Sequence, residues 1–268
     1  MMNSISMTRL AASVTGALGV APPAQAEPGI PQVQTLVHDM LGKCADRLMI
    51  YNPDCIAMWL YQKYTERFAP VMRATQLTVP MGTVMPAVTP VCFGTMYTGA
   101  MPAVHGIKTY AKPVIAIDSV FDAFARAGKK TALVTVENSS MDLIFRNRQI
   151  DYYPMPYGGE TTQKGLELIE GNAYDVVVVY NQEYDDMIHK TDPESPEAMA
   201  ALEKHIVSFQ QLTDAVRRCW SGVDSMVLWA PDHGVHVDWN GHGNHREFRE
   251  EDINVVHFYG VYPKSSTL

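Results

Sequence analysis

Short apolar runs recur along the chain and alternate with stretches of helical periodicity. A continuous apolar run between polar turns is typical of a strand that is buried on both faces of a sheet. Such runs occupy residues 47–52, 131–136, 174–180, 225–230 and 255–262. Apolar positions with the spacing of an amphipathic helix occupy residues 55–75, 117–130, 161–171 and 195–220. This alternation predicts an α/β fold whose central sheet is mostly parallel and has helices on both faces.

The first 45 residues precede the first predicted strand and form a separate, helical segment in this prediction, and residues 46–268 form the main domain. Within residues 1–26, one Arg, an apolar stretch from Leu10 to Ala21 and an Ala-Gln-Ala at 24–26 are the parts of a possible signal peptide. Polar residues interrupt the stretch and Pro22 and Pro23 follow it, which favours a first helix that ends in a Pro-rich turn. We therefore predict a cytoplasmic protein, with export through a signal peptide as the alternative.

Composition and charge exclude several classes of partner. The chain has 268 residues, of which 47% are hydrophobic, and a formal net charge of −8 without a long basic run. A nucleic-acid polymer is therefore not expected as a partner. No stretch approaches the roughly 20 apolar residues of a membrane span. The four cysteines have no paired spacing, which indicates reduced thiols. An apolar C-terminal strand and 16 methionines are compatible with a homo-oligomer.

Acids, histidines and a hydroxyl follow the predicted strands. Asp54 follows residues 47–52, Asp185 and His189 follow residues 174–180, and Asp232-His233-Gly234 follows residues 225–230. The segment 77–90 brings Thr89 to a fourth such loop. Five of the nine histidines lie between Ala230 and Phe258. Because chemistry gathers at the carboxyl ends of parallel strands, these side chains are expected to meet.

Carboxylates and imidazoles in such numbers suit a pair of divalent ions. Two ions about 3.5–4 Å apart can hold the attacking and leaving oxygens of an in-line displacement at phosphorus. Zinc accepts mixed nitrogen and oxygen ligands, and manganese or iron are alternatives.

Four segments, in this order, resemble motifs of the alkaline phosphatase superfamily, above all its type I phosphodiesterase and nucleotide pyrophosphatase branch. They are "TPVCFGTMYTGAMPAVHGI" at 89–107, "EYDDMIHKTDPES" at 183–195, "PDHG" at 231–234 and "GHGNH" at 241–245. The resemblance covers most of the chain from about Asp46 onward and implies an alkaline-phosphatase-like catalytic domain.

The resemblance implies a role for each matching residue. Thr89 takes the position of the nucleophile that becomes phosphorylated during the reaction. One metal ion would be bound by Asp54, Thr89, Asp232 and His233. The second would be bound by Asp185, His189 and His245, with His242 as the main alternative to His245 and His236 as a weaker one.

The sequence departs from the family pattern near the substrate. Tyr110 stands where many relatives have a phosphate-binding Asn, so Tyr110, Lys108, Lys112 or a backbone amide is expected to contact phosphate. The usual Asp-Gly after the first strand is Asp54-Cys55. The chain is also shorter than most relatives and has no evident cap domain, which leaves their nucleotide specificity open.

Structural roles are the alternatives for these residues. Asp54 could cap a helix that starts at Cys55, and Thr89 could cap a helix ahead of Pro90. We expect His105 and His257 to be structural, Cys92 to be a small buried residue, and the aromatic segment 151–159 to be a packed surface loop rather than a stacking platform for substrate.

The predicted activity is metal-dependent hydrolysis of a small phosphate ester, a phosphodiester or pyrophosphate, through a phosphorylated Thr89. A phosphomonoesterase, phosphotransferase or phosphonate hydrolase of the same superfamily is the enzymatic alternative. A metal-containing binding protein without catalysis is the non-enzymatic one.

Overall fold

The computed structural model describes residues 1–265 of the chain. Its strands are β1 (Arg47–Pro53), β2 (Leu77–Gly82), β3 (Thr131–Val136), β4 (Asp151–Met155), β5 (Val176–Asn181), β6 (Ser225–Trp229), β7 (His236–Val237), β8 (Gly243–Asn244) and β9 (Asn254–Tyr262). Its helices are α1 (Leu10–Ala17), α2 (Pro31–Leu41), α3 (Met58–Lys63), α4 (Ala69–Arg73), α5 (Thr89–Thr98), α6 (Pro102–His105), α7 (Val120–Arg126), α8 (Ser140–Ile144), α9 (Gly158–Glu170), α10 (Glu183–Ile188), α11 (Pro196–Cys219) and α12 (Glu250–Ile253).

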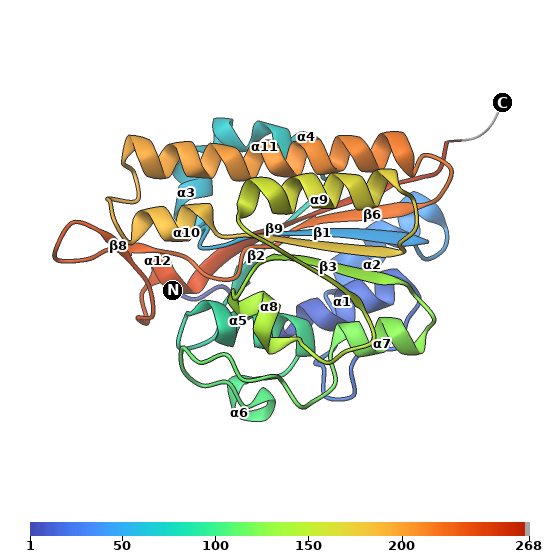
Figure 1. Ribbon diagram of the computed structural model, residues 1–268, viewed down its shortest axis with the longest axis horizontal. Coiled ribbons are helices and arrows are strands. Elements are labelled where there is room, and N and C mark those ends of the chain that lie inside the picture. Colours follow the sequence, from blue (N-terminus) through green and yellow to red (C-terminus); the bar gives the residue numbers. More distant parts are fainter. Residues whose placement is uncertain (266–268) are drawn as a thin grey trace.

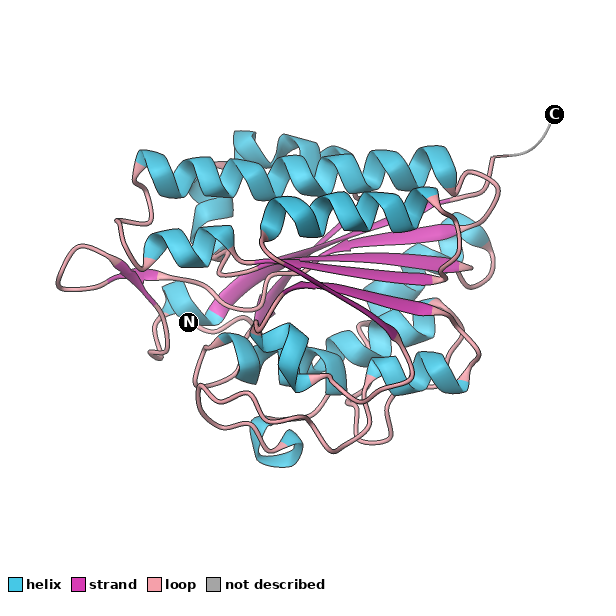
Figure 2. Cartoon of the chain, in the orientation of Figure 1, coloured by secondary structure: helices cyan, strands magenta, loops and turns pink. Residues whose placement is uncertain are grey.

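A seven-stranded sheet in the order β2-β9-β6-β1-β5-β3-β4 forms the centre of the molecule (Figure 1). β1 pairs in parallel with both β5 and β6, whereas β9 runs antiparallel to β2 and β6. Helices cover both faces, with α9 and α11 on one side and α1, α5 and α7 on the other (Figure 2). The predicted fold class is therefore confirmed.

Each central strand buries side chains on both faces. In β1, Leu48 and Ile50 belong to the core on the α1 and α5 side, and Met49 and Tyr51 belong to the core under α9 and α11. Successive side chains of a strand point to opposite faces, so a strand between two helical layers needs apolar residues at every position. This requirement explains the unbroken apolar runs in the sequence.

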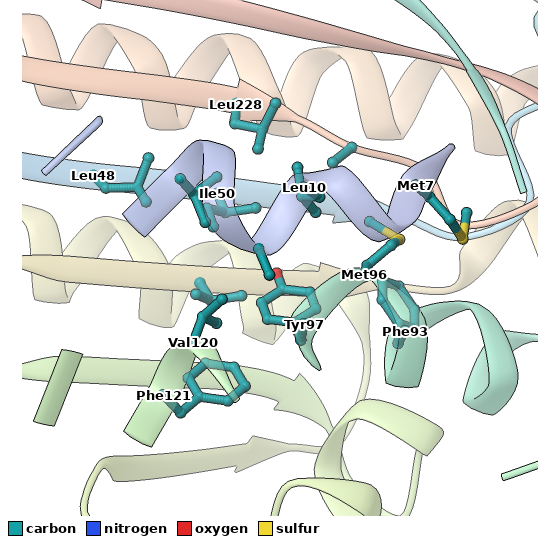
Figure 3. Close-up of a cluster of buried hydrophobic side chains, with 14 of the residues drawn as sticks. Met7, Leu10, Leu48, Ile50, Phe93, Met96, Tyr97, Val120, Phe121 and Leu228 are labelled. Carbon is teal, nitrogen blue, oxygen red and sulfur yellow. The ribbon is translucent and has the colours of Figure 1, made fainter. Parts of the chain in front are cut away.

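The N-terminal helix packs into the core of the sheet. Met7 and Leu10 are buried and belong to the same cluster as Leu48 and Ile50 of β1 and Phe93 of α5 (Figure 3). A side chain of this kind contributes roughly 1.5–3 kcal/mol when it is fully buried. The segment with the composition of a signal peptide is thus part of the hydrophobic core in this structure.

The prediction of one helix over residues 55–75 was wrong. The chain turns at Asp54 and Cys55, Ala57 forms an isolated bridge to Val255, and α3 begins only at Met58. A 3-10 turn over Thr65–Phe68 then leads into the separate helix α4. Pro70 lies in the first turn of α4, where its missing N–H costs nothing, and the same residue would break a continuous helix.

The prediction of a loop at 151–159 was wrong for its first half. Residues Asp151–Met155 form β4, which pairs in parallel with β3 at the edge of the sheet. Pro154 is tolerated because an edge strand has one side without a pairing partner.

The lengths of the helices and the state of the cysteines bear on whether the chain spans a membrane or contains disulfides. Among residues 1–265, no helix combines the length and apolar character that crossing a bilayer requires. Cys44, Cys55, Cys92 and Cys219 are all free thiols.

Two buried histidines should make the fold sensitive to acid. Burial lowers the pKa of His205 to about 3 and that of His257 to about 4, against an ordinary value of 6.5. Below pH 6.5 the unfolded chain therefore binds protons that the native state excludes. The stability that each neutral imidazole contributes is complete above pH 6.5 and is lost as the pH falls, by about 1.4 kcal/mol per histidine between pH 7.5 and 5.5.

Urea unfolding of wild type and His257→Gln at these two pH values tests this expectation. The difference between their free energies of unfolding should shrink by about 1.4 kcal/mol at pH 5.5, because only the wild type loses the contribution. His38→Gln, at an exposed position of α2, is the control and should show the same difference at both pH values. A pH-independent difference for His257→Gln would contradict the expectation.

Candidate metal centre

The carboxyl ends of β1 and β6 bring the first group of predicted ligands together. Asp54 follows β1, Asp232 and His233 follow β6, and one ligand atom from each lies within 4.8 Å of the other two. His233 Nε2 is 3.4 Å from Asp54 Oδ1 and 3.4 Å from Asp232 Oδ2. All three side chains are buried.

The second group lies beside it. Asp185 comes from α10, which follows β5, while His189 is at the end of this helix and His245 follows β8. Asp185 Oδ1 lies 3.5 Å from His189 Nε2 and 3.4 Å from His245 Nε2. The His245 ring also stacks on His233 of the first group, with a centroid distance of 4.0 Å. The two groups therefore form one continuous centre.

Three buried carboxylate oxygens in this centre have no hydrogen-bond donor. They are Asp54 Oδ1, Asp185 Oδ1 and Asp232 Oδ2. Leaving a buried polar atom without a partner costs roughly 1–3 kcal/mol, and more for a charged group. Each of the three oxygens faces an imidazole Nε2, as the distances above show.

The hydrogen bonds of Nδ1 determine which ring nitrogen of His233 and His245 carries the hydrogen. His233 Nδ1 lies 3.1 Å from the carbonyl oxygen of Gly234, and His245 Nδ1 lies 2.7 Å from that of Ala87. A carbonyl can only accept, so Nδ1 carries the hydrogen in both rings and the neutral ring presents a lone pair at Nε2. Lone pairs of nitrogen and oxygen thus face one another, and a divalent cation between them would satisfy both. The residues fit a metal centre.

Burial and the short distances between the carboxylates shift the pKa values of the first group. Burial, together with the charges of Asp232 and Asp185, raises the pKa of Asp54 well above its ordinary range. Burial is also the main reason that the pKa of Asp232 rises to about 7. Burial lowers the pKa of His233 well below its usual value, which keeps this ring neutral.

In the second group, which contains Asp185 and His245, the pKa values shift in the opposite directions. Burial alone would raise the pKa of Asp185, but the neighbouring imidazoles of His189 and His245 bring it well below its ordinary value. Burial works to lower the pKa of His245, and Asp185 more than offsets this effect and raises it.

Thr89 lies at the first position of α5 with its side chain directed at the first group. Its Oγ1 is 3.4 Å from His233 Nε2, and Val88 is the residue before the helix. Thr89 is therefore not the cap of α5. Asp54 is not a helix cap either, because α3 begins four residues later, after Ala57.

A cavity of about 110 Å³ opens onto the two groups. Asp54, Thr89 and Asp185 line it, together with Tyr110 and Lys112 from the segment after α6. Tyr110 lies between two cations, since Lys112 Nζ and Arg246 Cζ are each 5.7 Å from the centre of its ring. A larger cavity of about 410 Å³, between α9 and α11, contains none of the predicted ligands.

The remaining candidates lie outside the centre. His242 is half-buried on the turn between β7 and β8 and belongs to none of the ligand groups, whereas His245 lies beside Asp185. His236 pairs with Asp252 through a 2.7 Å contact. His105 packs against Gly94 and lies 3.0 Å from Thr95 Oγ1, which is a structural contact.

Some residues of the centre were not predicted from the sequence. The Tyr180 hydroxyl, at the end of β5, donates to Asp54 Oδ2 and thereby leaves Oδ1 to face His233. Asn138 and Ser139, in the loop after β3, line the cavity. The rule that identified the acids, namely their position at the carboxyl ends of strands, would also have identified these residues.

No protein-family model and no curated protein matches the chain. Solved structures do. Phosphonoacetate hydrolase from Sinorhizobium meliloti 1021 is 17% identical with a TM-score of 0.56, over 75% of this chain and 60% of that one. Murine ectonucleotide pyrophosphatase/phosphodiesterase 5 is 18% identical with a TM-score of 0.55, over 70% of this chain and 57% of that one. A 2-O GAG sulfatase is 11% identical with a TM-score of 0.56, over 81% of this chain and 64% of that one. The chain thus spans less than two thirds of each of these proteins.

Proposed function

Because this chain has the fold of the alkaline phosphatase superfamily, we propose that it is a metal-dependent hydrolase of phosphate esters with Thr89 as the nucleophile. The observation that carries the proposal is the set of three buried, unpartnered carboxylate oxygens that face imidazole lone pairs beside a threonine hydroxyl. A structural polar cluster would pair these atoms with donors.

Two divalent ions, of which zinc is our first choice and manganese or iron the alternatives, would be bound by the two groups. Asp54, Asp232, His233 and Thr89 would hold one, and Asp185, His189 and His245 the other. When bound, such ions lower the pKa of a coordinated hydroxyl or water and neutralise the charge that develops on phosphorus oxygens.

The threonine would react in two steps. Thr89 Oγ1 loses its proton to solvent and attacks phosphorus, so that an Oγ1–P bond forms, the bond from phosphorus to the leaving oxygen breaks, and the leaving group departs with the bonding electron pair. Water then attacks phosphorus, the Oγ1–P bond breaks, and Thr89 regains a proton. His233 Nε2 lies 3.4 Å from the hydroxyl, and the cavity that Thr89 lines would admit the substrate.

A phosphodiester or a pyrophosphate is the substrate class that we propose. The murine relative has also been solved as an inactive threonine-to-alanine variant in complex with AMP, which supports both a threonine nucleophile and a nucleotide-like ligand in that protein. The polar cavity of about 110 Å³ is small beside typical ligand pockets of roughly 300–1,000 Å³, which favours a compact substrate here. A phosphomonoesterase, phosphotransferase or phosphonate hydrolase is the alternative, and the phosphonoacetate hydrolase among the similar structures favours the last.

Nitrophenyl substrates test the proposal. Metal-loaded protein should hydrolyse bis(4-nitrophenyl) phosphate faster than 4-nitrophenyl phosphate, and the opposite preference would favour the monoesterase. If protein with bound metal hydrolysed neither ester nor phosphonoacetate between pH 6 and 10, a metal-containing binding protein would be the better description.

Lys112 is expected to bind the non-bridging oxygens of the substrate. Among residues 1–265 neither Lys112 nor Arg246 forms an ion pair, and Lys112 Nζ is held at the cavity by the carbonyl of Asn138 at 2.9 Å. A hydrogen bond to a charged group is worth roughly 1.5–3 kcal/mol, so Lys112→Met should lower kcat/KM about tenfold or more, mainly through KM.

Arg246→Gln should have a smaller effect in the same direction, because this side chain is exposed. The matched control is Arg249→Gln, three residues later in the same segment, whose guanidinium is already paired with Glu247 at 2.5 Å. If steady-state measurements gave the same kcat/KM for Lys112→Met and Arg249→Gln, Lys112 would not bind the substrate.

A further inference from the structure

Cys55 occupies a backbone position that most residues other than glycine, asparagine and aspartate avoid. Its φ is +67°, in the left-handed region, and the resemblance places glycine here, directly after the first aspartate. A non-glycine residue in this region costs of the order of 1 kcal/mol or more, and such strain concentrates at functional sites. The thiol therefore needs an explanation beyond the turn itself.

The thiol lies between the two groups of predicted ligands. Cys55 Sγ, a carboxylate oxygen of Asp185 and a ring nitrogen of His233 are all within 4.8 Å of one another. His233 belongs to the first group and Asp185 to the second, so the Cys55 thiol lies near a ligand of each group. The side chain is fully buried.

A second observation points to a cation at this position. Asp54 Oδ1 and Asp232 Oδ2, on side chains that are more than nine-tenths buried, lack hydrogen-bond donors and face the same His233 Nε2. The backbone N–H of Cys55 already donates to the other oxygen of Asp232, at 3.2 Å. The cysteine is thus tied to an aspartate that presents a free oxygen to the centre.

We propose that Cys55 is a metal ligand of this centre, acting as a thiolate beside His233 of the first group and Asp185 of the second. The proposal rests on the proposed function, since it assumes that the two groups bind metal ions. On binding, the S–H bond breaks, the proton leaves to solvent, and a sulfur–metal bond forms. The alternative is a small buried residue whose thiol donates only to the carbonyl of Gly234, 3.4 Å away.

A thiolate would change the metal that the centre prefers. Sulfur is a soft ligand that favours zinc over manganese and magnesium, whereas carboxylate and imidazole alone discriminate less. Removing the thiolate should therefore lower the affinity for zinc at least tenfold, by analogy with the roughly 10–100-fold effects of weaker perturbations at metal sites, and should leave the affinity for manganese within about threefold.

Cobalt substitution tests the proposal through a signal that does not depend on activity. The full chain, freed of metal and reloaded with Co²⁺, should show a near-ultraviolet sulfur-to-cobalt charge-transfer band, which Cys55→Ser should lack. Cys55→Gly provides a second variant that suits the positive φ, so misfolding does not obscure the result. Cys92→Ala is the matched control, because Cys92 is equally buried in α5 and belongs to none of the ligand groups.

The outcomes separate this proposal from the proposed function. Loss of the band in both Cys55 variants, with the band kept in Cys92→Ala, would support the proposal. A cobalt-loaded protein without the band, or with a band indifferent to Cys55, would overturn it and leave the metal-dependent hydrolase standing. Failure of wild type to bind cobalt or zinc at all would overturn both.

Discussion

Replacing Thr89 by alanine should reduce kcat/KM for bis(4-nitrophenyl) phosphate by a factor on the order of 10³ or more. The variant has no oxygen to form the bond to phosphorus, and removal of a covalent nucleophile leaves only the catalysis that substrate binding and charge stabilisation provide. Thr89→Ser should retain measurable activity because it keeps the hydroxyl. Initial rates with metal-saturated protein measure both effects.

The matched control for Thr89→Ala lies on the same helix. Thr98 is also buried in α5, but its hydroxyl donates to the carbonyl of Gly94 at 2.6 Å and it does not line the cavity. Thr98→Ala should therefore keep activity within about threefold of wild type. Equal activity of Thr89→Ala and wild type would show that another group attacks phosphorus.

Asp232→Asn should also have a large effect. We expect it to lower the activity and to raise the stability of the metal-free protein. The amide keeps the shape of the side chain and can still accept the hydrogen bond from Cys55, but it loses the charge that would bind metal. Metal content should fall by about one ion per chain, and activity by a factor on the order of 10² or more.

The metal-free protein should become more stable with the same substitution. Burial raises the pKa of Asp232 to about 7, so above that pH the native state holds a carboxylate in an environment that disfavours its charge. The destabilisation is complete above pH 7 and disappears as the pH falls toward 4. At pH 8 and without metal, Asp232→Asn should raise the free energy of unfolding by on the order of 2–4 kcal/mol.

Asp238→Asn is the control for this pair of effects, because Asp238 lies outside the ligand groups in the turn after β7. It should leave the metal content unchanged and should not stabilise the metal-free protein, because its carboxylate accepts hydrogen bonds from the Trp239 N–H and the Asn244 side chain. If Asp232→Asn lowered the stability of the metal-free protein, the carboxylate would be a structural acceptor rather than a metal ligand.

The sequence predicted the central strands because their environment leaves a strong pattern. β1, β3, β5, β6 and β9 lie inside the sheet between two layers of helices, and each has a nearly unbroken apolar run. The two edge strands are different. β2 contains Pro80 and β4 contains Pro154, and each exposes part of its length, so neither has the pattern of a buried strand.

The sequence predicted the acidic ligands because each follows a strand, but it did not predict the residues that contact them. Position after a strand identifies Asp54, Asp185 and Asp232 without knowledge of any contact. The hydrogen bond from Tyr180 to Asp54, and the position of Cys55 between the two groups, depend on contacts among segments more than 100 residues apart. No periodicity along the chain encodes such contacts.

Metal content of the purified full chain is the most direct test of the central claim, which is that the two groups form a two-metal centre. Elemental analysis after loading with zinc and removal of free ions should find about two ions per wild-type chain. Asp232→Asn and Asp185→Asn should each retain about one. Wild-type protein that retains no metal after this treatment would contradict the account, and its carboxylates and histidines would then need another explanation.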